Sequence, residues 1–183
     1  MGKIFVTSDW HFGHDRDFVW KARGFNNVHE MNQAIIDRHN AIVTEEDDVY
    51  VLGDLTLGDL ETGLKFIKQM RGKLHIILGN HDTNTRIAEY NKLYNVVEVV
   101  YATRIKVGKY TYFLTHYPCI TANIESNKLG HEAVNLFGHT HQTEKFYNDN
   151  PMMYHVGMDT HNCTPVLIED ALAEIKDKIK SLE

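Results

Sequence analysis

Histidine is unusually frequent in this sequence, which contains 12 His but only 3 Pro and 2 Trp among 183 residues. Imidazole is the commonest metal ligand in proteins and carries a proton near neutral pH, so histidines that occur beside carboxylates are candidates for chemistry. Several of them lie in short polar segments that also contain Asp, Asn or Gly. The candidate metal ligands in these segments are Asp9, His11, Asp54, Asn80, His116, His139 and His141.

These seven oxygen and nitrogen donors are enough to bind two cations. Because the set mixes imidazole, carboxylate and amide groups and contains no thiolate, it suits manganese, iron or zinc better than a structural, cysteine-rich zinc site. Gly53 precedes Asp54, and a glycine allows the backbone to approach closely. Asp54 is therefore well placed to bridge two ions, and the sequence predicts a dinuclear centre.

The chain shows no motif for a protein nucleophile. It has no Gly-x-Ser-x-Gly segment, no cysteine in a helix-opening phosphate loop and no Walker lysine motif. Cys119 lies close to His116 in the sequence, but a free cysteine is more typical of a packed thiol. This pattern favours water, activated by metal ions, as the attacking group.

Each group of candidate ligands follows directly on an apolar run that is typical of a buried strand. In open α/β sheets, functional residues lie on loops beyond the carboxyl ends of the strands. We therefore expect five loops that are distant in the sequence to meet at one place. The expected strands cover residues 3–7, 48–52, 74–78, 110–114 and 133–137.

Helical spacing of apolar residues alternates with these strands. Residues 96–107 instead favour strands that continue through a tight turn at Gly108 and Lys109 into Tyr110, so we expect a mixed sheet. The pattern as a whole indicates an α/β protein. The expected helices cover residues 28–40, 59–70 and 168–182.

Length and composition indicate one globular domain over residues 1–183. The formal net charge of -6 disfavours stable binding to duplex nucleic acid. The two cysteines, Cys119 and Cys163, are too few for a disulfide framework, which favours a reducing compartment. With no signal peptide pattern and no apolar run long enough to cross a bilayer, we expect a cytoplasmic protein without a membrane partner.

The ordered motifs resemble the signature of the calcineurin-like metallophosphoesterase family. Residues 155–159 and 164–166 are also similar to the tail of small phage and bacterial members, so the resemblance covers nearly the whole chain. The motifs that carry it are Asp9-x-His11, Gly53-Asp54, Gly79-Asn80-His81-Asp82, His116 and Gly138-His139-x-His141.

The resemblance implies a four-layer α/β/β/α sandwich with two mixed β-sheets flanked by helices, and a site with two divalent ions. Manganese is the favoured metal, with iron, zinc and nickel as alternatives. The implied ligand sets share Asp54 as a bridge: Asp9, His11 and His141 hold one ion, and Asn80, His116 and His139 hold the other.

The implied activity is hydrolysis of phosphate esters by a hydroxide that bridges the two ions. The substrate would be a small phosphate ester or a nucleotide, and phosphodiesters are favoured over monoesters because the whole ligand set and His81 are present. His81 would stay off the metals and assist the leaving oxygen, while Asp82 would hold His81 in position.

Other interpretations remain open at this stage. Taken alone, each ligand candidate is a plausible turn or capping residue. The fold can also serve as a non-catalytic metal-binding or protein-interaction module, although such proteins typically lose ligands that this chain retains. A metal-dependent hydrolase of amides or acyl esters is a third candidate, which the segment Gly-Asn-His-Asp disfavours.

Several residues outside the motifs have two interpretations. His14 is either a substrate contact or an ordinary loop residue, and Arg23 is either a phosphate contact or a solvated arginine. Four aromatic residues either line the entrance of the site or belong to the core. They are Phe12, Trp20, Phe25 and Tyr117.

Overall fold

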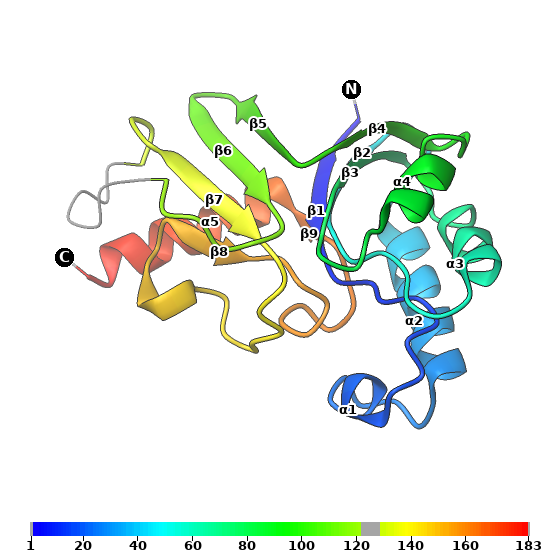
Figure 1. Cartoon of the computed structure of the whole chain (residues 1–183). Coiled ribbons are helices and arrows are strands. Elements are labelled where there is room, and N and C mark those ends of the chain that lie inside the picture. The colour runs from blue at the N-terminus through cyan, green and yellow to red at the C-terminus, as the bar shows by residue number, and fades with distance from the viewer. Residues whose placement is uncertain (1, 122–128, 183) are drawn as a thin grey trace.

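Two β-sheets form the centre of the molecule, and the chain passes from one to the other between β4 and β5 (Figure 1). The computed structural model describes residues 2–121 and 129–182. In the first sheet, β1 to β4 are parallel and β9 runs antiparallel to β1. Its strands, in spatial order, are β4 (Val96–Val100), β3 (Lys73–Ile77), β2 (Asp48–Leu52), β1 (Ile4–Thr7) and β9 (Val166–Leu167).

The second sheet begins with an antiparallel hairpin, in which Val107 pairs with Tyr110 across the turn at Gly108 and Lys109. The remaining strands of this sheet are parallel to their neighbours. Both sheets are therefore mixed, which confirms the predicted α/β fold with two mixed sheets and helices. The strands, in spatial order, are β5 (Ala102–Val107), β6 (Tyr110–Thr115), β7 (Ala133–Phe137) and β8 (Met153–His155).

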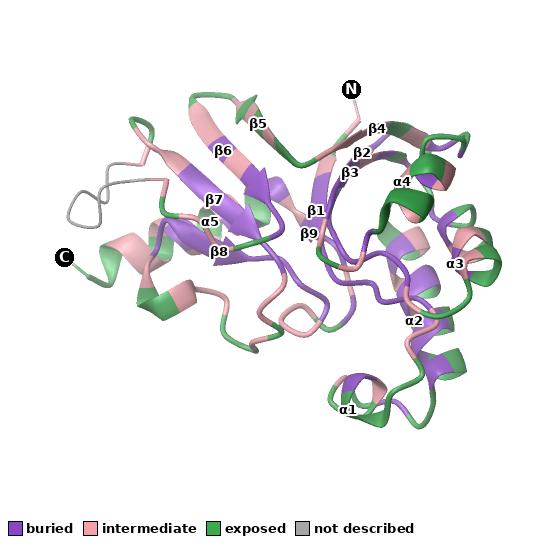
Figure 2. Cartoon of the chain, in the orientation of Figure 1, coloured by how far each residue is buried: buried purple, intermediate pink, exposed green. Residues whose placement is uncertain are grey.

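The helices lie on the sides of the two sheets. In Figure 1, α2, α3 and α4 lie beside the first sheet, α5 lies behind the second, and the short α1 stands next to α2. Figure 2 shows that β1, β2, β3, β7 and β8 are mostly buried, whereas β4, β5 and the outward sides of the helices are half-buried or exposed. The helices are α1 (Asp17–Trp20), α2 (Val28–Ile42), α3 (Leu60–Ile67), α4 (Asn84–Tyr90) and α5 (Ile168–Lys180), with a short 3-10 helix at Tyr147–Asp149.

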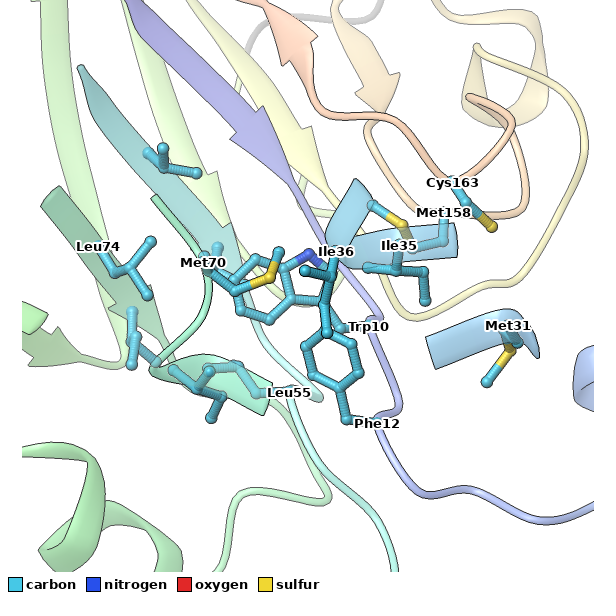
Figure 3. Packing of buried hydrophobic residues seen from close by; sticks show 14 of the residues in the cluster. Trp10, Phe12, Met31, Ile35, Ile36, Leu55, Met70, Leu74, Met158 and Cys163 are labelled. Atoms are coloured by element: carbon cyan, nitrogen blue, oxygen red, sulfur yellow. The ribbon is translucent and has the colours of Figure 1, made fainter. Parts of the chain in front are cut away.

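A first apolar cluster joins these helices to the first sheet. Trp10 and Phe12 are fully buried in it, beside Ile35 of α2 and Leu55 (Figure 3). His11 lies between the two aromatic residues in the sequence. Its ring does not join the aromatic pair in the core, since Nε2 of His11 lies 3.1 Å from Nε2 of His141.

A second cluster fills the space between the sheets. Val6 and Leu52 of the first sheet pack with Leu114 and Leu136 of the second. The helix α5 contributes to this same cluster. Its buried residues are Ile168, Ala171 and Ile175.

Three kinds of feature were not predicted from the sequence. The strands β8 and β9 have only three and two residues, too few to show an alternating pattern. The helix α4 begins two residues after the Gly-Asn-His-Asp segment and was not expected. Residues 96–107 form two strands in different sheets, because the chain changes sheets at Tyr101.

In the part of the chain that the structure describes, no helix has the length and apolar character that crossing a membrane requires.

We expect Ile175→Ala to lower the free energy of unfolding by about 2–5 kcal/mol, because the side chain is fully buried between α5 and the sheets and its removal leaves a cavity. Urea denaturation followed by circular dichroism measures the change. Lys180→Ala on the exposed side of α5 is the control and should leave stability nearly unchanged. An equal, small effect of both substitutions would show that α5 does not contribute to the core.

Candidate metal centre

Loops at the carboxyl ends of the strands bring all seven candidate ligands together. Both sheets contribute to the site. The loops after β1, β2 and β3 carry Asp9, His11, Asp54 and Asn80, and the loops after β6 and β7 carry His116, His139 and His141.

Three of these residues form a first donor group. The Nε2 atoms of His11 and His141 lie 3.1 Å apart. The Oδ1 atom of Asp9 lies 3.9 Å from the first ring nitrogen and 4.0 Å from the second. These are separations that ligands of one small cation would have.

Three more form a second donor group. The Oδ1 atom of Asn80 lies 2.9 Å from Nε2 of His116 and 2.9 Å from Nδ1 of His139. The two ring nitrogens are 3.1 Å from each other. One oxygen and two nitrogens therefore converge on one point.

The carboxylate of Asp54 lies between the two groups. Its Oδ2 atom is 3.8 Å from Nε2 of His11 and 3.5 Å from Nε2 of His116. Its Oδ1 atom accepts a hydrogen bond of 2.9 Å from the backbone N–H of His81. Asp54 thus lies close to both donor groups, and its bridging role stays a prediction.

Burial and charge in the first group favour a bound cation. Asp9 is fully buried, and burial raises the pKa of its carboxyl. Burial also lowers the pKa of His11 to about 2, so its ring is neutral and offers a lone pair. Burial alone would lower the pKa of His141, but the hydrogen bond to Asp159 and the negative field of Asp9 outweigh it and raise the pKa. A field that stabilises positive charge on His141 also attracts a metal ion.

The second group fits a cation as well. Nδ1 of His116 donates a hydrogen bond of 2.7 Å to the carbonyl oxygen of Leu52. In the neutral ring, Nε2 therefore carries a lone pair, and this lone pair faces the amide oxygen of Asn80 at 2.9 Å. Two acceptors at this distance repel each other unless a proton or a metal ion lies beside them. The residues present thus fit a divalent ion.

Backbone strain is concentrated at this site. Nine described residues other than glycine have a positive φ, and five of them are candidate ligands. Such φ values are uncommon outside glycine, and they cluster where the surrounding structure enforces them for function. The five are Asp9 (59°), His11 (50°), Asp54 (56°), His139 (68°) and His141 (50°).

Glycines allow the loops to approach one another. A Cβ atom on Gly138 would lie 1.9 Å from Oγ of Ser8 and 2.5 Å from Oδ2 of Asp9. A Cβ atom on Gly79 would lie 2.2 Å from Oδ1 of Asp54. The residues before His139 and Asn80 must therefore be glycine for the loops to meet.

Asp82 does not make the contact with His81 that the sequence analysis predicts. Its carboxylate accepts backbone N–H groups of Asp54 and Gly79, both at 2.9 Å, and the hydroxyl of Tyr90 at 3.0 Å. The expectation that Asp82 holds the ring of His81 is therefore wrong. The acid is buried and fastens the loop of Asp54 to the loop of Asn80.

Asp159 was missed as a site residue by the sequence analysis, although it lies in the segment 155–159 that resembles the tail of small family members. Its Oδ2 atom accepts a hydrogen bond of 2.8 Å from Nδ1 of His141, so that in the neutral ring the lone pair of Nε2 faces the first donor group. The Nε and Nη2 groups of Arg23 each donate a hydrogen bond of 3.0 Å to the same carboxylate. These three residues form a chain of hydrogen bonds behind the first donor group.

Arg23 is neither a solvated arginine nor a group that is free for substrate. Its side chain is only 1% exposed. Besides Asp159, it donates to the backbone carbonyl oxygens of Asp9 and Trp10. The guanidinium group therefore supports the loop that carries the ligands.

The other candidates divide between the site and the core. Phe12 and Phe25 are buried in the core, and Trp20 packs against it. Tyr117 is 47% exposed, and its ring lies 4.6 Å from that of His139, beside the second donor group. His14 lines the same cleft as His81, so its contact with substrate stays a prediction.

Comparisons with known proteins agree with this arrangement. A protein family described as the calcineurin-like phosphoesterase superfamily domain matches residues 3–178. An uncharacterized protein of Methanocaldococcus jannaschii is 28% identical over 186 residues, which cover 98% of this chain and 94% of that protein. The gene 66 protein of Mycobacterium phage L5 is 28% identical over 137 residues, or 66% of this chain and 65% of the phage protein.

A solved structure shows the same fold. The crystal structure of a protein of unknown function from Aquifex aeolicus superposes with a TM-score of 0.68 over 93% of this chain and 97% of that chain. The two sequences are 18% identical, so this likeness concerns the fold.

We expect Asp159→Asn to weaken Mn²⁺ binding by about 10–100-fold, because the amide holds His141 and attracts positive charge less well than the carboxylate does. Isothermal titration calorimetry on protein stripped of metal measures the affinity. Asp170→Asn, at an exposed position of α5, is the matched control. An affinity that is unchanged in Asp159→Asn would contradict the role given to the hydrogen-bonded chain.

Proposed function

The chain belongs to the calcineurin-like phosphoesterase superfamily, and from this premise we propose that it hydrolyses phosphate esters with the help of two divalent metal ions. We favour manganese, with iron, zinc and nickel as alternatives, because the donors are imidazole, carboxylate and amide groups. The observation that carries the proposal is the convergence of two donor groups on the shared carboxylate of Asp54. Such a centre has no need of a protein nucleophile.

The first ion would be held by Asp9, His11 and His141, and the second by the other donor group, with Asp54 between them. When bound, two divalent ions would neutralise the charge of a phosphate and would lower the pKa of water, which would supply hydroxide as the nucleophile near neutral pH. The protein's own contribution is to keep each donor in place through close loop contacts and the hydrogen bonds of Asp82 and Asp159, which hold the ligands at their positive φ values.

His81 is the proposed proton donor to the leaving oxygen. Its Nε2 atom lies 3.9 Å from Oδ2 of Asp54, and its side chain is 42% exposed, so it reaches both the centre and the solvent. An imidazole at this place can protonate an alcohol as it leaves. We favour phosphodiesters over monoesters as substrates, because His81 and the whole set of candidate ligands are present together.

The proposed substrates are small phosphate esters or nucleotides. The net charge of -6 gives no support for stable binding to a duplex. A cytoplasmic location is part of the same proposal, since only two cysteines are present and both are free thiols.

We expect the Mn²⁺-loaded protein to hydrolyse bis(p-nitrophenyl) phosphate, and p-nitrophenyl phosphate more slowly. Excess chelator should abolish release of p-nitrophenol, and so should Asp54→Asn, because the bridging carboxylate would be lost. Release that persists in both controls would rule out the dinuclear mechanism. If two ions bind but no phosphate ester is cleaved, the chain is a non-catalytic binding module instead.

We expect His81→Ala to lower turnover by about 10²–10⁴-fold while metal content stays near that of the wild type, since His81 donates a proton and binds no ion. Turnover is measured with diphenyl phosphate, because its phenolate leaving group needs a proton more than p-nitrophenolate does. Metal content is measured by plasma mass spectrometry. His29→Ala, an exposed histidine of α2, is the matched control. Loss of bound metal in His81→Ala would assign this residue to the ligands and refute the proposed role.

A further inference from the structure

A cleft of about 570 Å³ separates the first donor group from α1. One side of it is polar and the other is apolar. Its walls are formed by His11, His81 and His141 on the polar side and by Phe18, Val19 and Ala22 on the apolar side.

The size of the cleft exceeds what a bare phosphate requires. Pockets of about 300–1,000 Å³ are typical of sites that bind organic molecules of nucleotide or drug size. The volume of about 570 Å³ therefore leaves room beside the metal centre for an organic group of the ester. Because His81 belongs to the polar wall, this room lies on the side of the proposed leaving group.

Phe18 is placed to contact that group. Its ring is 69% exposed, while its neighbour Val19 is 7% exposed and lies in the core cluster. The core thus fixes the position of α1, and Phe18 stays uncovered on it. An exposed aromatic ring on a firmly held segment gains free energy when a ligand buries it.

The ring of His14 lies between the ring of His11 at the metal centre and the ring of Phe18. The ring of His14 lies 5.4 Å from that of His11, and 5.8 Å from that of Phe18 in an edge-to-face arrangement. This geometry is the one that aromatic pairs prefer. A planar ring bound in the cleft would therefore find aromatic rings to pack against, those of His14 and Phe18.

The charges of the cleft favour an uncharged group. Among the described residues that line it, only Asp159 carries a formal charge near neutral pH, apart from the histidines. That carboxylate is already used by His141 and Arg23. No free charged side chain of this wall is therefore left to pair with an ionic substituent.

We propose that Phe18 and His14 form a subsite for a planar, uncharged aromatic group of the substrate, on the leaving-group side of the ester. The inference rests on the proposed hydrolysis of phosphate esters and adds the class of ester to it. The subsite selects aryl or nucleobase-bearing esters over alkyl esters, and Phe18 determines this selectivity.

Binding of two non-hydrolysable probes tests the subsite without turnover. We expect the Mn²⁺-loaded wild type to bind phenylphosphonate about tenfold more tightly than ethylphosphonate, since one stacked ring contributes on this order. Phe18→Ala should remove most of this difference, Phe18→Trp should keep it, and ethylphosphonate affinity should change little. Tyr101→Ala is the control, because Tyr101 is also a highly exposed aromatic residue but does not line the cleft. Equal losses for both probes in Phe18→Ala would overturn the subsite.

Kinetics separate this inference from the proposed function. The loss of kcat/KM on Phe18→Ala is compared for phenyl phosphate and ethyl phosphate, because the ratio within each substrate cancels the different reactivity of the two esters. A loss about tenfold larger for phenyl phosphate is expected, at unchanged metal content. If both substrates turn over and lose equally, the subsite is refuted and the hydrolase stands. If the wild type cleaves no ester yet prefers phenylphosphonate through Phe18, the hydrolase fails and the subsite stands.

Discussion

The burial of two carboxylates against a set of imidazole nitrogens is the constraint on which this structure depends. Asp9 is fully buried and Asp54 nearly so, and their nearest polar neighbours include the rings of His11 and His116. Buried charge is costly unless it is paired or coordinates a metal. Among the described residues, no arginine or lysine forms an ion pair with either carboxylate, so the local chemistry favours cations at this place.

The surrounding structure maintains this unfavourable arrangement at a cost in folding free energy. The loops meet only because the ligands adopt strained backbone conformations and because positions 79 and 138 are glycine. The buried hydrogen bonds of Asp82 then hold the loops in contact. Trp10 and Phe12 anchor the first loop in the core on either side of His11. Local preferences are violated where the ligands lie and satisfied in the clusters around them, which is common at functional sites.

Much of this arrangement could be predicted from the sequence. The strands before Asp9, Asp54 and His139 are buried, apolar and bounded by polar residues, so their pattern was clear. The order of the motifs then predicted which side chains meet. Asp82 and Arg23 could not be placed in this way, because a side chain's hydrogen-bond partners depend on how distant loops pack. Asp159 lies four residues beyond β8, and this strand of three residues is too short for its pattern to indicate a functional loop after it.

Each of the two donor groups takes residues from both sheets. Asp9 and His11 follow β1, whereas His141 follows β7, and the second group joins Asn80 of the first sheet to His116 and His139 of the second. Ions held in this way would act as reversible crosslinks between the halves of the molecule. The availability of metal would then affect the stability of the folded protein as well as its activity. Since any ligand that binds only the folded state stabilises it, scarcity of metal would favour partial opening along the seam between the sheets.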